Sequence, residues 1–559
     1  MRQFSATEKF IFGALAIVAF VTAIMMAANV NAYFSTTIPA YGGELREGVV
    51  GLPRTVSPVL AITDVDRDLS SLVYAGLTRY DGTSIVPDIA KSWTVSDDGL
   101  TYSFMLRPNV RFQDGTLLTA DDVAFTIQKV QDSALKSPHR ADWSNVTVQE
   151  ISPSEIHFIL KQPYSPFLTN TTIGIMPKHI WANVSTDQFI FSQYNISPIG
   201  SGPYKISSVI NDKGGIPTEY RLSTWSGYYG TVPYISSVTF KFFGDDGKAL
   251  AALDSGVIDS LSSIAPADAA RLATDSAQAY KVLSAPLPRI FGVFFNQSQA
   301  PALADKNVRT ALDMSVDRNA IVKAVLSGYG VPIDGPLPTG FPGADTQPAG
   351  GADISGAQAL LEKNGWKKNA AGIYEKKTGK ITQDLAFDIY TADTPDLKQA
   401  AQLVQKSWLA MGAQVTVKVF EPSDLYQNVI RTRKYDALLF GELIGKDRDL
   451  YAFWHSSQRN APGLNVALYA NSAADKLLES IRATGDDATR NAQYAQFEKM
   501  IQTDVPAVFL YVPDFTYVVP KALHDISLNT ITVSADRWDS ISSWYLATEN
   551  VWKIFAKKQ

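Results

Sequence analysis

Apolar residues recur at helical spacing in the stretch from about Pro395 to Met411. Successive apolar positions are three or four residues apart, which places them on one face of a helix. These positions are Leu397, Ala401, Val404, Trp408 and Met411. Gly412 follows directly and predicts the end of the helix, because glycine readily adopts the left-handed conformation found at helix C-termini.

The segments on either side of this helix alternate between apolar and polar residues. Val415, Val417 and Val419 alternate with polar residues after the helix, and the segment 385–389 (Leu-Ala-Phe-Asp-Ile) has the same period before it. A period of two is typical of a half-buried strand. The order strand, helix, strand predicts a βαβ unit.

Residues suited to helix capping predict three further helices. Thr119 and Asp122 form a helix start signal before an apolar face. Asp305 precedes a second helical pattern, and Asp317 precedes a third pattern that ends near Gly328.

Stretches rich in proline and glycine interrupt the pattern at three places. The longest, residues 335–351, predicts an exposed loop without regular structure. Residues 197–203 and 286–289 are shorter breaks. Helix and strand signals alternate between these breaks, which predicts a mixed α/β architecture.

A long uncharged segment lies near the N-terminus. Arg2 and Lys9 precede a run from Phe10 to Ala28, and no further charge occurs until Glu44. Such a run, as a helix, spans about 29 Å, close to the thickness of the hydrocarbon core of a bilayer. Positive charge before the run and none after it predicts that the N-terminus lies on the cytoplasmic side of the membrane and the body on the outer side.

The length of this run favours an uncleaved anchor. We expect residues 1–9 in the cytoplasm, a transmembrane anchor over residues 10–30 and an uncharged tether over residues 31–43. A cleaved signal peptide is the main alternative, because Val30-Asn31-Ala32 resembles a small-residue cleavage site. A buried core helix is a third alternative.

Composition narrows the classes of function. The 559 residues predict about three or four domain-sized units. The net charge of −5 offers no basic field to nucleic acid, so we expect no such partner. The absence of cysteine excludes disulfides, thiolate metal sites, cysteine nucleophiles and a lipid attached to cysteine.

The sequence also lacks the usual motifs of an extracytoplasmic hydrolase. Its five histidines form no HExxH motif or close pair, which leaves a zinc site without support. It has no G-x-S-x-G or Walker motif, and the pair Asp121 and Asp122 is explained by the start of a helix. We therefore expect that the protein is not an enzyme and that it binds neither a metal nor a cofactor. A membrane-tethered hydrolase stays an alternative, because the sequence does not give the distance between two carboxylates.

Short motifs follow one another in order from Gly42 to about Pro520. The most specific block, Leu106–Gly115 (LRPNVRFQDG), runs into Leu118–Val123 (LTADDV). The others are Pro87–Trp93 (PDIAKSW), Ser96–Phe104 (SDDGLTYSF), Gly200–Tyr204 (GSGPY), Phe294–Asn296 (FFN) and Val308–Leu312 (VRTAL) with Asp317-Arg318. Together they resemble the family 5 solute-binding proteins of ABC importers, of the oligopeptide- and dipeptide-binding type.

The resemblance implies an α/β, two-lobe, periplasmic-binding-protein-like (type II) fold with an extra domain on the first lobe, besides the N-terminal transmembrane helix. The family region would span residues 44–519, with a C-terminal return to lobe one over 520–559. Lobe one would take about 40–85, 200–290 and 520–559, the extra domain about 86–199, and lobe two about 291–519. Chain crossings near Leu287–Phe295 and Tyr511–Pro520 would form the hinge.

The resemblance also implies a function without chemistry on the ligand. The protein would capture a peptide between its lobes and deliver it to the permease of an ABC importer. Ligand would stabilise the closed form, because only that form contacts it from both sides. A sugar, a metal chelate or a cell-wall fragment is an alternative ligand for the same fold.

Peptide-binding members of the family hold the ligand α-amino group with a carboxylate of the second lobe. The corresponding segment here departs from that pattern, because Ile444 stands at the expected position and Glu442 and Asp447 are the nearest carboxylates. For Asp447, a role in stabilising a turn is the alternative. The predicted ligand contacts are Ile62, Thr63 and Asp64 in lobe one, and Phe440, Gly441, Glu442, Leu443, Asp447 and Trp454 in lobe two.

Overall fold

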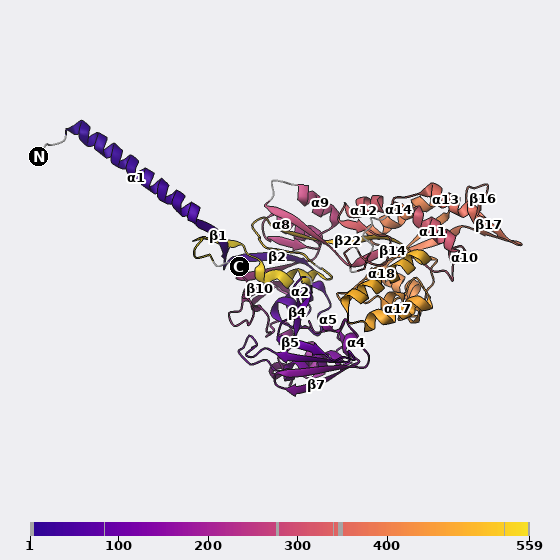
Figure 1. Cartoon of the computed structure of the whole chain (residues 1–559), viewed down its shortest axis with the longest axis horizontal. Coiled ribbons are helices and arrows are strands. Elements are labelled where there is room, and N and C mark those ends of the chain that lie inside the picture. The colour runs from indigo at the N-terminus through magenta and orange to yellow at the C-terminus, as the bar shows by residue number, and fades with distance from the viewer. Residues whose placement is uncertain are drawn as a thin grey trace.

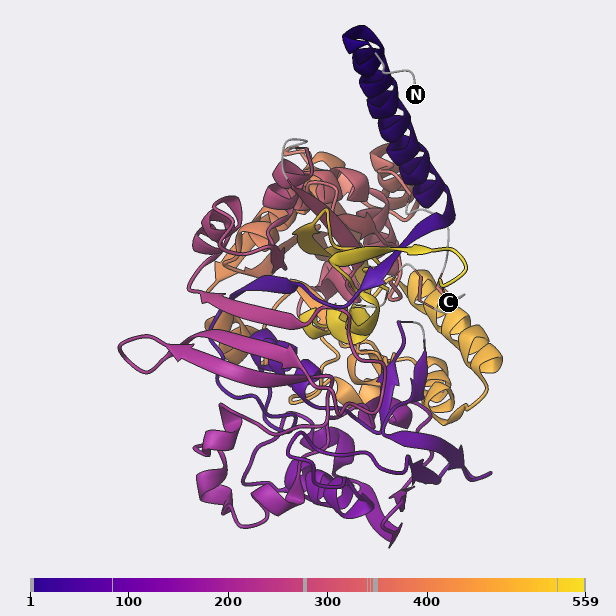
Figure 2. The ribbon, with the colours of Figure 1, turned by 90° about the vertical axis from the view of Figure 1, so that its left-hand side faces the viewer.

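A long N-terminal helix stands apart from a two-lobed body (Figure 1). The computed structural model describes residues 5–82, 84–274, 279–338, 340–341, 343–344, 350–529 and 531–556. Lobe one adjoins the helix, lobe two forms the opposite end of the body, and the extra domain lies to one side of lobe one. Figure 2 shows the same arrangement along the long axis.

The N-terminal helix α1 (Ala6–Phe34) is longer than the predicted anchor. It begins after Ser5, whose hydroxyl accepts a hydrogen bond from the Glu8 amide. Residues 7–34 are long and apolar enough to cross a membrane, and none of the apolar window is buried against the body. The alternative of a buried core helix is therefore wrong.

One mixed sheet runs through both lobes. In the part of the chain that the structure describes, this sheet has 12 strands. The strands of lobe one are β9 (Tyr204–Asn211), β10 (Pro217–Thr224), β11 (Ser237–Phe243), β2 (Glu44–Val50), β12 (Ser260–Ser262) and β13 (Tyr280–Pro286). Those of lobe two are β14 (Arg289–Phe295), β15 (Gly330–Pro332), β19 (Ala386–Ala392), β20 (Gln414–Phe420) and β21 (Ala437–Leu443).

A single strand, β22 (Ala507–Pro520), belongs to both lobes. Its first part pairs with β14 and β15 of lobe two, and its last part pairs with β12 and β13 of lobe one. The 14 residues of this strand thus carry the sheet from one lobe to the other.

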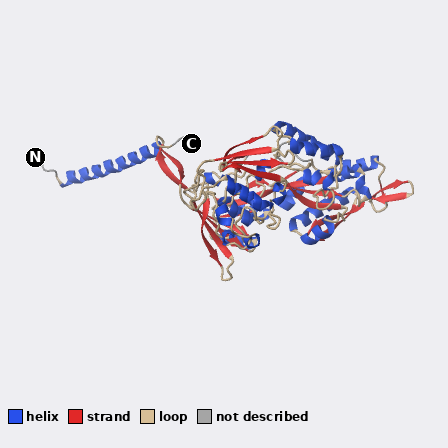
Figure 3. Cartoon of the chain, turned by 90° about the horizontal axis from the view of Figure 1, so that it is seen from below, coloured by secondary structure: helices blue, strands red, loops and turns tan. Residues whose placement is uncertain are grey.

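Helices cover both faces of the sheet in each lobe, as Figure 3 shows in blue. In lobe one, α2 (Asp64–Val73) and the 3₁₀ segment Ser534–Ser543 pack on one face, and α8 (Asp246–Asp254) and α9 (Pro266–Thr274) pack on the other. The helices on one face of lobe two are α11 (Lys306–Met314), α12 (Arg318–Leu326), α13 (Ile354–Lys363) and α14 (Pro395–Met411). Those on the other are α16 (Tyr451–Trp454), α17 (Ser472–Ala483) and α18 (Asp487–Asp504).

The extra domain is built on a separate antiparallel sheet of four strands. These are β5 (Ala90–Val95), β6 (Thr101–Leu106), β8 (Glu155–Leu160) and β7 (Val146–Ser152). Helix α3 (Ala120–Gln131) covers it, with four shorter helices, α4 (Arg140–Trp143), α5 (Phe167–Asn170), α6 (Lys178–Trp181) and α7 (Thr186–Phe189). The hairpin of β3 (Thr78–Tyr80) and β4 (Ile85–Pro87) joins this domain to lobe one.

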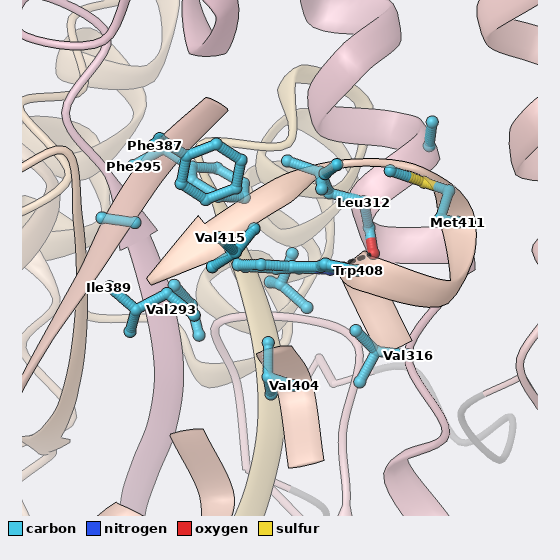
Figure 4. Packing of buried hydrophobic residues seen from close by; sticks show 14 of the residues in the cluster. Val293, Phe295, Leu312, Val316, Phe387, Ile389, Val404, Trp408, Met411 and Val415 are labelled. Atoms are coloured by element: carbon cyan, nitrogen blue, oxygen red, sulfur yellow. Dashed lines mark hydrogen bonds between the residues drawn. The ribbon is translucent and has the colours of Figure 1, made fainter. Parts of the chain in front are cut away.

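The predicted βαβ unit is confirmed by α14 between β19 and β20, which pair in parallel. Figure 4 shows how the apolar face of α14 packs, with Trp408 at its centre. The Trp408 indole is fully buried and donates a hydrogen bond of 2.9 Å to the Leu312 carbonyl. Gly412 ends the helix with a φ of +114°, as expected.

The three capped helices are also confirmed. In α3, the Asp122 carboxylate accepts a hydrogen bond of 2.9 Å from the Thr119 amide. The side chains of Asp305 and Asp317 likewise accept backbone amides at the starts of α11 and α12. Helix α12 ends at Leu326, two residues before Gly328.

The prediction of an exposed loop at 335–351 is wrong for its first part. Residues 335–338 are buried, and Leu337 belongs to the core of lobe two. Phe341 packs edge-on against Tyr494 of α18. The described residues of this proline-rich stretch form no helix or strand, but their apolar side chains still cover the core. Residues 339, 342 and 345–349 of the predicted loop lie outside the described residues.

A buried ion cluster joins distant parts of lobe one. The Arg537 guanidinium is fully buried and lies 2.7 Å from an Asp68 oxygen and 2.9 Å from a Glu47 oxygen. The second Glu47 oxygen accepts a hydrogen bond of 2.8 Å from the Tyr517 hydroxyl. The cluster ties together β2, α2, β22 and the C-terminal 3₁₀ segment, and its charges require one another because none of them reaches water.

We expect Arg537→Met to lower the free energy of unfolding by about 3–5 kcal/mol, because it leaves two buried carboxylates without a counter-charge. The control is Arg221→Met, which removes a half-exposed guanidinium bound to Glu219 and should cost under about 1 kcal/mol. Urea denaturation measures both. A similar small loss in both variants would contradict the role given to the cluster.

Candidate functional site

The two chain crossings between the lobes lie where β13 and β14 meet β22. Pro286 of β13 pairs with Asp514, and Phe291 of β14 pairs with Tyr511. Between these pairs β22 has neither β13 nor β14 as a neighbour, but it stays paired with β15, in which Gly330 lies opposite Pro513. The Leu287 amide also donates a hydrogen bond of 2.9 Å to the Pro513 carbonyl, so this level is where β22 changes its partner from lobe two to lobe one.

The loop after β21 lies beside these crossings and reaches lobe one. The Ile444 amide donates a hydrogen bond of 2.8 Å to the Pro288 carbonyl at the crossing. The Lys446 ammonium lies 2.8 Å from Asp536 and 3.0 Å from Asp539, both in the C-terminal segment of lobe one. It also lies 4.3 Å from the centre of the Tyr80 ring. Lys446 thus joins lobe two to lobe one.

The same loop contacts the extra domain. The Tyr164 hydroxyl donates a hydrogen bond of 3.3 Å to the Asp447 carboxylate. Asp449 is paired with Arg482 of α17 at 2.9 Å, and the Arg482 carbonyl accepts the Ser165 amide at 2.9 Å. The segment 444–449 is therefore one place where lobe two meets both other parts of the body.

Contact between the lobes changes the acidity of the carboxyl groups in this segment and opposite it. Burial raises the pKa of Asp447 to about 6, and the neighbouring charge of Asp449 adds to the effect. Burial also raises the pKa of Asp539 to about 6, although the Lys446 charge opposes this. The meeting point of the lobes is thus a poorly hydrated site that holds ionisable groups.

Glu442 lies just before this segment, near the end of β21, and has no polar partner in the part of the chain that the structure describes. It is 3% exposed in β21, and neither carboxylate oxygen has a hydrogen-bond partner among the described residues. Burial raises its pKa well above the ordinary value of 4.5. It lies opposite Ile290, close to the crossing. A buried carboxyl group without a partner costs free energy, so this position is suited to a donor that arrives with a ligand.

The other predicted contacts of lobe two divide between the surface and the core. Phe440 and Gly441 are partly exposed, and Leu443 is 41% exposed. Trp454 is fully buried and packs against Phe294 and other rings, which places it in the core of lobe two.

The predicted contacts of lobe one lie at the start of α2. Ile62 is 56% exposed. Thr63 caps the helix through Asp66, and the Asp64 carboxylate pairs with Arg67 one turn along. Among the described residues, no hydrogen bond or ion pair joins these three to Glu442 or Asp447.

A cavity of about 290 Å³ lies elsewhere in lobe two, beside α18. Its lining includes Asp313, Asp334, Lys499 and Gln502, and none of the predicted contacts. Asp313 is paired with Arg318, and Asp334 accepts a hydrogen bond from Gln502. In the part of the chain that the structure describes, no group of three His, Asp or Glu side chains is placed to hold a metal ion.

The sequence did not reveal the residues that join the lobes. Lys446 lies within the predicted segment, but Tyr80, Asp536 and Asp539 lie far from it in the chain. Tyr164 and Arg482 are similarly distant from Asp447. No local pattern marks such pairs, because each member of a pair has the sequence context of an ordinary surface residue.

Replacement of Glu442 by glutamine should stabilise the protein increasingly as the pH rises. The folded protein keeps the Glu442 proton above pH 4.5, whereas the unfolded chain releases it, so wild-type stability falls with rising pH in that range. We expect the stability gain of Glu442→Gln to grow by up to about 1.4 kcal/mol per pH unit. Urea denaturation from pH 5 upward, with Glu375→Gln of the β17 strand (Tyr374–Thr378) as control, measures this. A gain that does not change with pH would show that Glu442 is ionised in the folded protein.

Comparison with known proteins agrees with the two-lobe arrangement of the body. Residues 84–462, more than half of the chain, match the family described as "Bacterial extracellular solute-binding proteins, family 5 Middle". The chain is 29% identical to the oligopeptide-binding protein AppA of Bacillus subtilis (strain 168) over 533 residues, which cover 93% of this chain and 95% of AppA.

Solved structures show the same fold. AppA from Bacillus subtilis, in complex with a nonapeptide, is similar with a TM-score of 0.68 at 26% identity, over 91% of this chain and 100% of that one. NikZ from Campylobacter jejuni, in complex with Ni(L-His), gives a TM-score of 0.69 at 27% identity, over 90% and 99%. The expected two-lobe, type II fold with an extra domain is thereby confirmed. The chain belongs to family 5 of the bacterial extracellular solute-binding proteins.

Proposed function

We propose that this protein captures peptides between its two lobes and delivers them to the permease of an ABC importer, with no chemistry on the ligand. The observation that carries the proposal is the similarity over 93% of the chain to a relative named for oligopeptide binding. We place the lobe boundaries near Leu287–Pro288 and Pro513–Asp514, where β22 changes its pairing from β14 to β13, and propose that they serve as the hinge.

The structure also suggests how lobe closure and ligand binding are coupled. The segment 444–449 contacts lobe one and the extra domain in this structure, and separation of the lobes would break these contacts. A ligand held between the lobes adds contacts to that form alone and so shifts the population toward it. Glu442, buried near the hinge, is the proposed acceptor for a ligand ammonium, with Asp447 as the second candidate.

A solute other than a peptide is the second candidate. Ile444 stands where peptide-binding members are expected to carry a carboxylate, and a similar structure holds Ni(L-His). A ligand without a free ammonium would leave Glu442 neutral, as its raised pKa favours.

The proposed location is the outer side of the cell membrane, with α1 as the anchor. The helix is 29 residues long, and its apolar window is not buried against the body. Both properties fit an uncleaved signal anchor, with a cleaved signal peptide as the alternative.

Purified full-length protein should carry a ligand that is chemically unchanged. We expect mass spectrometry of acid-released material to show short peptides, and incubation with peptide and glycan mixtures to leave their composition unaltered. The retained compound should also raise the melting temperature and reduce the radius of gyration in solution scattering. Steady turnover of either mixture would overturn the binding function in favour of a hydrolase.

Glu442→Gln or Asp447→Asn should weaken the retention of peptides with a free amino group. Loss of the partner of a desolvated ammonium costs about 2–5 kcal/mol. The measurement is retention of a peptide mixture before and after N-acetylation, quantified by mass spectrometry. Asp384→Asn, on the exposed β18 strand (Ile381–Asp384), is the control.

The N-acetylated mixture should be affected little by either substitution. Unchanged retention of both mixtures by both folded variants would show that neither carboxylate holds the ligand amine. Ile444 would then indicate a ligand that has no free ammonium.

A further inference from the structure

The C-terminal end of the chain pairs with the strand that follows α1. Strand β1 (Ser35–Ala40) and strand β23 (Ala547–Trp552) form an antiparallel ribbon, in register from Ser35 opposite Trp552 to Ala40 opposite Ala547. A hydrogen bond of 2.8 Å from the Thr37 hydroxyl to the Asn550 amide oxygen supports the pairing. The expected tether is therefore part of a two-stranded ribbon, visible where yellow meets indigo in Figure 2.

The base of the ribbon contacts the last turn of α1. The Trp552 indole donates a hydrogen bond of 2.7 Å to the Asn31 side-chain oxygen, and the Lys553 amide donates one of 2.6 Å to the Phe34 carbonyl. The Lys553 ammonium lies 5.2 Å from the centre of the Tyr33 ring. The C-terminal segment is thus fixed at the level where the candidate membrane span ends.

Large apolar side chains are exposed at this level. Ile554 and Phe555 are 76% and 75% exposed, and Tyr33 is 72% exposed. Trp552 and Phe34 lie beside them, each about half exposed. A cluster of this kind is unfavourable in water, because it leaves a contiguous apolar patch unburied.

The chemistry of the cluster fits the interface between a bilayer and water. Tryptophan and tyrosine are enriched there, because their rings are apolar and carry one polar group. The side chain of Lys553 can lie along apolar surface while its ammonium reaches lipid phosphates. The sequence continues with two further lysines, Lys557 and Lys558. The cluster is continuous with a helix whose own apolar surface is suited to lipid.

We propose that Trp552–Phe555 form a second membrane contact, inserted among the lipid headgroups of the outer leaflet beside the end of α1. The contact makes the ribbon a fixed support between lobe one and the membrane. This inference rests on the proposed anchoring by α1, so its test must separate the two.

The natural absence of cysteine allows a nitroxide label at one introduced cysteine in the full chain. Ala556→Cys places the label beside the cluster and leaves its aromatic residues intact. Ile381→Cys, in a hairpin at the far end of lobe two, is the aqueous control at a position 71% exposed. Met25→Cys, within the apolar run, reports on the anchor. The chain is reconstituted into nanodiscs of phosphatidylcholine and phosphatidylglycerol.

We expect the labels at 25 and 556 to be relaxed mainly by oxygen, which concentrates in lipid, and the label at 381 mainly by a water-soluble nickel chelate. Adding Trp552→Ser and Phe555→Ser should remove the oxygen preference at 556 and leave that at 25 unchanged. A label at 556 that behaves like the one at 381, while 25 remains in lipid, overturns the second contact alone. A label at 25 exposed to the nickel chelate, or a mature N-terminus at Tyr33, overturns the anchor and the inference together.

Discussion

The body of this protein depends on one strand, β22, that both lobes share. Strand β22 supplies the pairing edge for β14 and β15 in lobe two and for β12 and β13 in lobe one. Separation of the lobes by translation would therefore break a ladder, whereas rotation near Tyr511–Asp514, where β22 passes from β14 to β13, would keep most of the pairing. Pro513 lies at this level, opposite Gly330 of β15, and has no amide hydrogen to lose when the strands bend. A binding protein needs such motion, because its lobes must open to admit a ligand and close to hold it.

Closure brings together groups that are costly to bury, and the cost is distributed unevenly. Lys446 has two acidic partners, and Asp449 has Arg482, so these charges are compensated within the contact. Glu442 has no such compensation. Buried polar groups without partners are rare in proteins and concentrate at functional sites. Glu442 at the end of β21 thus differs from the paired charges of the loop that follows it, and this difference is the reason for proposing it as a ligand contact.

Local signals in the sequence determined which elements could be predicted. Helix α14, its glycine terminus and its flanking strands follow from spacing alone, because the whole signal lies within about 35 residues. The pairing of Lys446 with Asp536, or of Thr37 with Asn550 across 513 positions, has no local signal. Trp454 illustrates a second limit. From the sequence alone, an aromatic residue near a predicted site can equally line the cleft or fill the core, and Trp454 fills the core. Side-chain burial depends on the packing of α16 to α18 and not on the neighbouring residues.

The ribbon would limit the distance and orientation of the body relative to the membrane in which α1 is proposed to lie. A single extended tether over residues 35–43 would allow movement over about 30 Å and in all directions. Pairing with β23 joins lobe one to the end of α1 by two chains, and this restricts both distance and orientation. A permease in the same bilayer would then meet a binding protein at high effective concentration and with part of the orientational entropy already lost. With α1 as the proposed anchor, lobe one would lie nearest the membrane and lobe two at the far end (Figure 1). Because the ribbon would hold lobe one beside the anchor, a rotation where β22 passes between the lobes would move lobe two during capture of a ligand.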